Sequence, residues 1–248
     1  MNILILDTCG AAASVVFAET EPRQEVVAAA TLPGRTASER LVATIRELAA
    51  TAEGGLQSVG AIAVVYGPGS FTGVRIGLSA AKGLSEALGV PLVAVSRIAV
   101  LAHLAAANDA TGRTVFALLD AGRGEAYLGI YSGGECVREA LVTGAQLLAA
   151  IAEAASAGAA THVVVCESTL AKTFAELNPE FIAEPTAVDA LALVHPRIQA
   201  KDFDDAATID ANYLRRTDAE IFAKPAASRA ASPQVASGEP RQAGGGTA

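Results

Sequence analysis

Tryptophan is absent from the 248 residues, aromatic side chains make up only 4%, and there are three cysteines and three histidines. Cys9, Cys136 and Cys166 lie far apart without a Cys-x-x-Cys pair, which fits neither a disulfide framework nor a zinc site and favours a reducing cytoplasm. No two histidines are three or four residues apart, so we expect no histidine-based metal site. The few aromatic rings leave little surface for stacking single-stranded nucleic acid.

Positive charge is also scarce, because 18 basic residues stand against 26 acidic ones and the net charge is −8. This excess of acid argues against direct, tight binding of nucleic acid. The mean hydropathy of +0.39 comes largely from alanine, and no uncharged stretch of about 18 residues is rich in large apolar side chains. The N-terminus shows no basic segment or cleavage site of a signal peptide. We therefore expect a soluble, cytoplasmic protein without a membrane span.

The first half of the chain reads as a β-hairpin followed by alternating helices and strands. Two apolar runs flank a turn at 7–10, which predicts the hairpin. A helix should follow with a capping box between Thr36 and Glu39. The run at 61–66 is apolar throughout, as expected for a strand covered on both faces. The other predicted elements are strands 3–6, 14–18, 26–32 and 91–95, a helix that follows the glycine-rich segment at 67–73 and runs to about 88, and a helix from about 98 to 107.

The second half begins with the same pattern. Strands at 114–119 and 126–131 flank a turn that starts at Asp120, so Asp7 and Asp120 occupy equivalent places and indicate an internal duplication. A strand at 162–166 and helices at 144–157, 169–177 and 187–198 follow. We expect an N-terminal half at 1–109, a C-terminal half at 110–222 and, for lack of large apolar periodicity, a disordered tail at 223–248.

A strand, an aspartate at its end and a turn of small residues, occurring twice, form the pattern of the two phosphate loops in the actin, sugar-kinase and heat-shock-ATPase superfold. Turn N–H groups attract phosphate oxygens, and a carboxylate holds the accompanying cation. The alternative is that Asp7 and Asp120 only cap their turns. Asp7, Thr8 and Asp120 are accordingly weak candidates for contact with a nucleotide.

The segment at 67–73, GPGSFTG, is the most distinctive glycine-rich stretch. It is not a P-loop, since no Lys-Ser or Lys-Thr follows Gly73, and Thr72 stands where a dinucleotide fingerprint needs glycine. Ser70 or Thr72 can cap the next helix. Gly73 and Gly77, four residues apart, predict that this helix closely approaches another backbone. The absence of a G-x-S-x-G motif argues against a serine nucleophile.

Five segments together resemble the TsaB (YeaZ) family of bacterial tRNA threonylcarbamoyladenosine biosynthesis proteins, from about Met1 to Ile221. The block GPGSFTGVRIGL, with its Lys-Gly-Leu seven residues after the arginine, is the most specific of them. The five segments are ILILDTCGAAASVVF, ASERLVATIREL, GPGSFTGVRIGLSAAKGLSEALGVPLVAVS, LLDAGRGEAYLGIY and YLRRTDAEI.

The resemblance implies a duplicated actin-like (ASKHA, ribonuclease H-like) α/β fold with two βββαβα halves. It implies a noncatalytic scaffold without a cofactor of its own. Its partner would be TsaD, which transfers a threonylcarbamoyl group to N6 of the adenosine next to the anticodon in tRNAs reading codons that begin with A. The ATPase TsaE would complete the assembly. tRNA would be reached only through the complex, and a homodimer of the free chain and a nucleotide at the interface both stay open.

The resemblance also places the partner interface on the first two helices, whose exposed-looking residues are Leu41, Ile45, Phe71, Val74, Arg75, Leu78 and Lys82. Two positions depart from the family pattern. Ala37 stands where many members have histidine, so no role of that histidine applies to this chain. Gly122 stands where arginine is common, so this position lacks the side chain that could contact an anion. The alternatives are an active nucleotide-dependent kinase or carbamoyltransferase that uses Asp7 and Asp120, and a glycoprotease-like peptidase, for which no nucleophile or metal pair is found.

Overall fold

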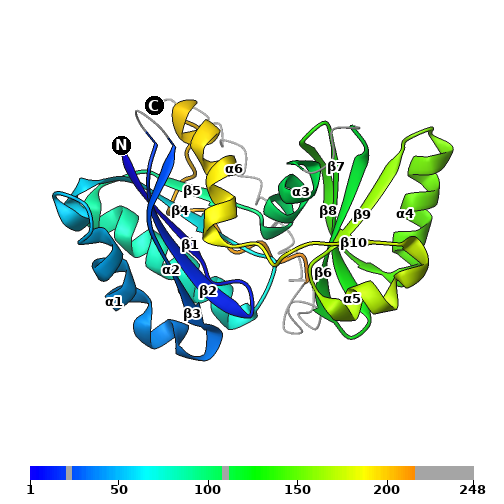
Figure 1. Cartoon of the computed structure of the whole chain (residues 1–248), viewed down its shortest axis with the longest axis horizontal. Helices are drawn as coiled ribbons and strands as arrows, with labels where there is room; N and C mark the ends of the chain where they lie inside the picture. The colour runs from blue at the N-terminus through cyan, green and yellow to red at the C-terminus, as the bar shows by residue number, and fades with distance from the viewer. Residues whose placement is uncertain (21–23, 108–111, 216–248) are drawn as a thin grey trace, which may run out of the picture. The chain divides into compact units, whose positions relative to one another are not determined.

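The computed structural model describes residues 1–20, 24–107 and 112–215, which form two five-stranded mixed sheets (Figure 1). The strand order is β3-β2-β1-β4-β5 in the first sheet and β10-β9-β6-β7-β8 in the second. The strands of the first sheet are β1 (Asn2–Asp7), β2 (Ala12–Glu19), β3 (Glu25–Pro33), β4 (Val59–Val65) and β5 (Leu92–Val95). Those of the second are β6 (Thr114–Gly122), β7 (Glu125–Ser132), β8 (Glu135–Thr143), β9 (Thr161–Val165) and β10 (Glu180–Phe181).

Both sheets have one topology. In each, three strands connected by hairpins run antiparallel, a fourth strand pairs in parallel with the first of them, and a fifth pairs in parallel with the fourth. Replacing β1–β5 by β6–β10 converts one strand order into the other. The duplicated α/β fold predicted from the repeated hairpin is thereby confirmed.

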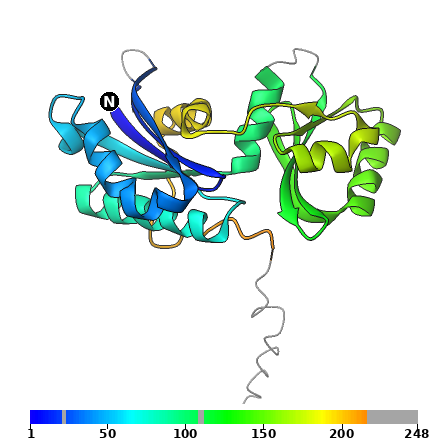
Figure 2. The same cartoon turned by 60° about the horizontal axis from the view of Figure 1, so that its bottom comes forward.

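Each sheet is covered by two helices from its own half and one from the other half. On the first sheet α1 and α2 lie on one face and α6 on the other (Figures 1 and 2). On the second sheet α3 contacts β6, β7 and β9, while α4 and α5 belong to the same half. Because helices cover both faces, β4 is buried along nearly its whole length, as its apolar sequence predicts. The helices are α1 (Ala37–Ala49), α2 (Phe71–Leu88), α3 (Arg97–Ala107), α4 (Gly144–Ser156), α5 (Ser168–Thr173) and α6 (Ala187–Gln199).

The exchange of α3 and α6 means that each core is built from both halves of the sequence. Ile98 and Leu101 of α3 are buried among residues of the second sheet, and Leu191 and Val194 of α6 are buried in the core of the first. Residues 1–215 form one compact unit. The boundaries expected at 109 and 222 stay predictions, and the tail at 223–248 lies outside the described residues. Over the described part of the chain, no helix has both the length and the apolar character needed to span a bilayer.

Helix ends follow the sequence signals in one case and depart from them in another. Ser70 caps α2, because its hydroxyl accepts the N–H of Gly73 at 3.3 Å, and the helix ends at Gly89 with a φ of 66°. The capping box expected at Thr36 is wrong. A 3-10 turn at Gly34–Thr36 precedes α1, and the Thr36 hydroxyl donates to the Pro33 carbonyl at 3.1 Å. The hydroxyl therefore leaves the first-turn N–H groups uncapped.

After α6 the chain returns along the free edge of β5. The N–H of Asp204 donates to the carbonyl of Leu92 at 2.9 Å, and the N–H of Ala94 donates to the Asp204 carboxylate at 2.7 Å. Asn212 then donates its N–H to the carbonyl of Tyr66 at 2.9 Å. These bonds satisfy an exposed sheet edge, and they bring the residues after Asn212 onto α2.

Candidate functional site

A cleft of about 530 Å³ opens at the turn between β1 and β2. One wall is this turn, and a second is the start of α2, at Gly69–Gly73. The charged side chains lining the cleft come from positions far apart in the sequence: Arg97, Asp120, Glu167 and Glu184. The cleft therefore gathers both hairpin turns at which the sequence repeats.

The glycines of the GPGSFTG segment let α2 lie directly on the β1–β2 turn. A Cβ atom at Gly73 would lie well under 3.0 Å from the carbonyl oxygen of Thr8, and one at Gly77 would meet the Thr8 hydroxyl as closely. That hydroxyl donates to the carbonyl of Gly73 at 2.6 Å, and the N–H of Ser70 donates to the carbonyl of Cys9 at 2.8 Å. The predicted close approach of this helix to another backbone is confirmed.

The two aspartates of the duplicated hairpins make the same local contact. Asp7 accepts the N–H of Cys9 at 2.8 Å, and Asp120 accepts the N–H of Gly122 at 2.7 Å, so each carboxylate bonds the backbone two residues ahead. Thr8 and Asp120 line the cleft, whereas the side chain of Asp7 is buried at 2% exposure. Burial raises the pKa of Asp7, although the nearby Arg97 guanidinium opposes the rise. The turn-capping contact is thus present at both aspartates.

An ion pair between a buried arginine and an exposed glutamate, which the sequence did not predict, lies at the edge of the cleft. Arg97, in the first turn of α3, is only 4% exposed and pairs with the carboxylate of Glu184, which precedes α6. The N–H of Ala11 donates to the same carboxylate at 3.1 Å. A cation in the first turn of a helix opposes the helix dipole. An arginine at this position is therefore a sequence clue to an acidic partner elsewhere in the chain.

The buried thiols have the properties of core residues. Cys9 donates to the carbonyl of Val65 at 3.1 Å, and burial raises the pKa of Cys9 and of Cys166 well above the ordinary thiol value. A thiol held protonated at neutral pH is a poor nucleophile. This agrees with the interpretation of both cysteines as buried structural residues.

Four of the seven residues expected at the partner interface are not exposed, contrary to what their sequence pattern suggested. Leu41, Ile45, Val74 and Leu78 are between 2% and 6% exposed and belong to the core of the first sheet. The apolar stripes of α1 and α2 face the protein's own strands, because those strands need cover on this face. An added charge at these positions would therefore damage the fold before it could test an interface.

The other three residues lie toward the surface of α2. Phe71 is 50% exposed, Arg75 is exposed and Lys82 is half-buried. The Arg75 guanidinium lies 3.6 Å from the centre of the Phe71 ring, and its Nε donates to the Tyr213 hydroxyl at 2.7 Å. We call these three side chains the Phe71–Arg75–Tyr213 stack. Tyr213 was missed because only the returning C-terminal segment brings it to α2.

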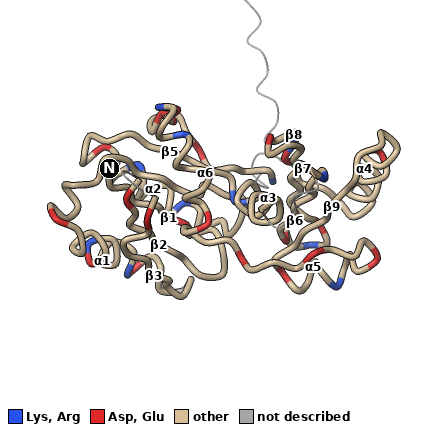
Figure 3. Tube along the Cα trace, turned by 45° about the horizontal axis from the view of Figure 1, so that its top comes forward, with Lys and Arg blue, Asp and Glu red and all other residues tan. Residues whose placement is uncertain are grey.

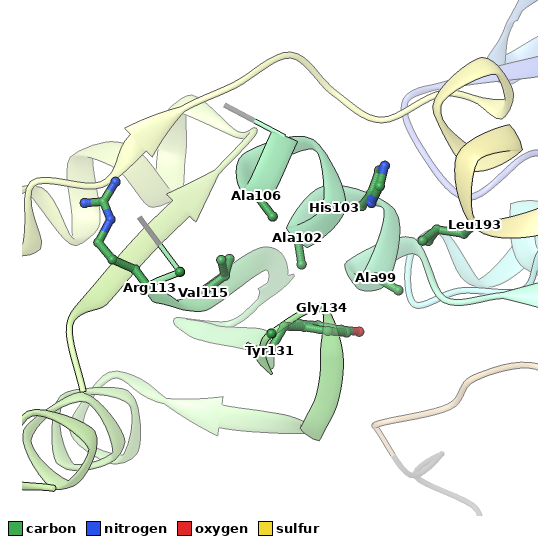
Figure 4. Close-up of a pocket in the computed structure, with 11 residues that line it drawn as sticks. Ala99, Ala102, His103, Ala106, Arg113, Val115, Tyr131, Gly134 and Leu193 are labelled. Carbon is green, nitrogen blue, oxygen red and sulfur yellow. The ribbon is translucent and has the colours of Figure 1, made fainter. Parts of the chain in front are cut away.

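A second cavity, of about 220 Å³, lies between α3 and the strands β6 and β7 (Figure 4). Ala102, Val115 and Tyr131 line it, and its surface is mostly apolar. The side chains of His103 and Arg113 point away from it in Figure 4, while the Tyr131 hydroxyl donates to Glu139 at 2.6 Å. The polar groups at this cavity are thus directed elsewhere, and the cleft remains the candidate site.

Along the described chain, basic residues stand singly among acidic ones, without a continuous basic stretch (Figure 3). Nor do the described residues bring together three histidine, cysteine, aspartate or glutamate side chains in a group able to hold a metal ion.

Two halves of one topology, with exchanged helices and a cleft at their first turns, define a protein of the duplicated actin-like class. A family model described as "TsaD: tRNA N6-adenosine threonylcarbamoyltransferase" matches residues 30–237. The chain belongs to this family, as a member of its TsaB (YeaZ) type.

Individual relatives are similar over part or most of their length. The tRNA threonylcarbamoyladenosine biosynthesis protein TsaB of Escherichia coli (strain K12) is 34% identical over 135 residues, which are 54% of this chain and 57% of that protein. The TsaB of Haemophilus influenzae (strain ATCC 51907 / DSM 11121 / KW20 / Rd) is 35% identical over 51% of this chain and 52% of its own length. The chain thus spans about half the length of the curated relatives it matches. The solved structure of YeaZ from Pseudomonas aeruginosa has 27% identity and a TM-score of 0.65, covering 86% of this chain and 99% of that one.

Proposed function

We propose that this protein takes part in tRNA threonylcarbamoyladenosine biosynthesis in the cytoplasm, as a noncatalytic scaffold for a TsaD-type transferase working with TsaE. Membership of the TsaB type supports the pathway. The scaffold role draws support from the cleft, where a thiol and a carboxylate of the first hairpin are buried and bonded to backbone groups. The protein would act by holding its partner in an active conformation.

The Phe71–Arg75–Tyr213 stack carries the proposal. An exposed aromatic ring covered by a guanidinium presents a broad surface whose shape is already fixed, because Arg75 also bonds Tyr213. Aromatic and arginine side chains dominate the energetics of protein interfaces. A concave surface lined by Arg75 and Lys82 of α2 and by Asp210 adjoins it, so apolar and charged contacts lie side by side here.

The test is capture of purified TsaD by this chain, measured by analytical ultracentrifugation. Phe71→Ala and Arg75→Glu should each weaken capture by about 2 kcal/mol or more, as truncation of a central interface residue does. Because Phe71 is half exposed, the variants should keep the circular dichroism spectrum of the wild type.

Two matched variants control for the loss of an exposed ring and for the reversal of a surface charge. Phe181→Ala removes a ring that is 58% exposed on β10, and Lys172→Glu reverses an exposed charge in the last turn of α5. Both should capture TsaD normally. If the folded Phe71→Ala and Arg75→Glu proteins capture TsaD as well as these controls do, the assigned face is wrong.

A further inference from the structure

We propose that Ala11 and Arg97 form an oxyanion-binding site that the protein fills from within its own chain, with the carboxylate of Glu184. Glu184 lies in the segment that leads from β10 to α6 (Figure 1). Its Oε1 accepts the N–H of Ala11 at 3.1 Å and pairs with the Arg97 guanidinium. This site would bind anions in the isolated chain, independently of any partner.

The donors are held in place before any anion arrives. Arg97 is 96% buried, and its backbone N–H donates to the carbonyl of Gly67 at 2.8 Å. Among the described residues its Nε has no hydrogen-bond partner. A buried guanidinium with a donor to spare is suited to a planar or tetrahedral oxyanion, and a turn N–H beside it completes such a cradle.

Gly10 lies directly beside the Glu184 carboxylate and the Arg97 guanidinium. A Cβ atom at Gly10 would lie under 3.0 Å from both Glu184 Oε1 and the Arg97 guanidinium. Gly10 needs no positive φ, since it is not among the residues with that backbone conformation. The absence of a side chain at Gly10 therefore leaves room for the carboxylate against the guanidinium.

The occupant is held less firmly than the cradle. The Glu184 side chain is 41% exposed, against 4% for Arg97, so the carboxylate can turn toward solvent while the guanidinium stays. In its resting position Glu184 blocks the donors and, together with Asp120 and Glu167, makes the cleft lining acidic. An external anion should therefore bind weakly to the wild type and better once Glu184 is removed.

The test is whether a free anion can take the place of the Glu184 carboxylate once that side chain is removed. Inorganic phosphate and acetate are the two separate probes. Thermal unfolding of the wild type, Glu184→Ala and Glu176→Ala is followed against probe concentration, with chloride at equal ionic strength as the reference. Glu176 is an exposed carboxylate in a 3-10 helix, so Glu176→Ala loses the same charge outside the cradle. A ligand that binds only the folded state stabilises it by RT ln(1 + c/Kd) at free ligand concentration c, so the dependence of the unfolding temperature on probe concentration reports the affinity.

We expect at least one of the two probes to bind Glu184→Ala about tenfold more tightly than it binds the wild type or Glu176→Ala. Preference for acetate identifies a carboxylate ligand, and preference for phosphate a phosphoryl ligand. The Ala11 amide resonance should shift on binding. Equal affinity in all three proteins, or binding that leaves the Ala11 amide unmoved, overturns the proposal. If Glu184→Ala does not fold, Glu184→Gln, which keeps the size and removes the charge, decides by the same two readouts.

Discussion

A methyl group at Gly73 perturbs the contact between α2 and the β1–β2 turn without changing charge. In Gly73→Ala the new Cβ atom would lie far under 3.0 Å from the backbone carbonyl oxygen of Thr8. A backbone oxygen cannot rotate away as the end of a flexible side chain can. The helix and the turn must therefore separate, and the 2.6 Å hydrogen bond from the Thr8 hydroxyl to the Gly73 carbonyl should break.

The size of the effect follows from three terms. Forcing a methyl group into a close-packed contact costs about 1–3 kcal/mol, and a lost hydrogen bond costs about 1 kcal/mol. Replacing glycine by alanine within a helix returns about 0.5–1 kcal/mol. We expect the free energy of unfolding to fall by about 2 kcal/mol.

Gly83 provides the matched control in the same helix. A Cβ atom there meets no other atom within 4 Å, so Gly83→Ala should raise the free energy of unfolding by about 0.5–1 kcal/mol. Urea unfolding followed by circular dichroism measures both variants, with an unchanged m-value as the sign that only stability has changed. If Gly73→Ala is as stable as Gly83→Ala, the glycine spacing does not serve this contact.

Three further predictions concern the core, the buried aspartate and catalysis. Ile45 is 2% exposed, so Ile45→Glu should lower the free energy of unfolding, measured in a thermal or urea melt, by about 4 kcal/mol or more. Val42 on the same helix is 62% exposed, so Val42→Glu should change it by less than about 0.5 kcal/mol. The folded-state pKa of Asp7 is raised above 3.8, so its contribution to stability is complete below that pH and is lost as the pH rises through the folded pKa. In Asp7→Asn the free energy of unfolding should lack this loss with rising pH. A pH profile identical to that of the wild type would contradict the burial argument. The isolated chain should hydrolyse ATP no faster than buffer, and turnover that disappears in an Asp7→Asn, Asp120→Asn double variant would favour the kinase alternative.

Local patterns in the sequence predicted most of the fold. The apolar runs, the turn at 7–10 and the repetition at Asp120 gave the hairpins and the duplication, because strand and turn preferences act over a few neighbouring residues. The strands β8 and β10 were not predicted in this way, since most of β8 is exposed and β10 has two residues. The 3-10 turn before α1 was also not predicted, because the sequence pattern at Thr36 and Glu39 is that of a capping box.

The candidate site was predicted less well, because its contacts join distant parts of the chain. Thr8 and Asp120 were found through their hairpins, whereas the pair of Arg97 and Glu184 spans 87 residues and has no motif. Periodicity located the apolar faces of α1 and α2 without showing what covers them. The structure assigns that cover to the protein's own sheet and leaves Phe71 and Arg75 outside.

Cellular depletion tests the central proposal most directly, with nucleoside mass spectrometry of digested tRNA as the measurement. Depleted cells should lose N6-threonylcarbamoyladenosine while threonylcarbamoyl adenylate is still made. Wild type and Phe181→Ala should restore the modification, and Phe71→Ala should not. Undiminished modification in depleted cells that hold no second copy of the protein would contradict the proposed function.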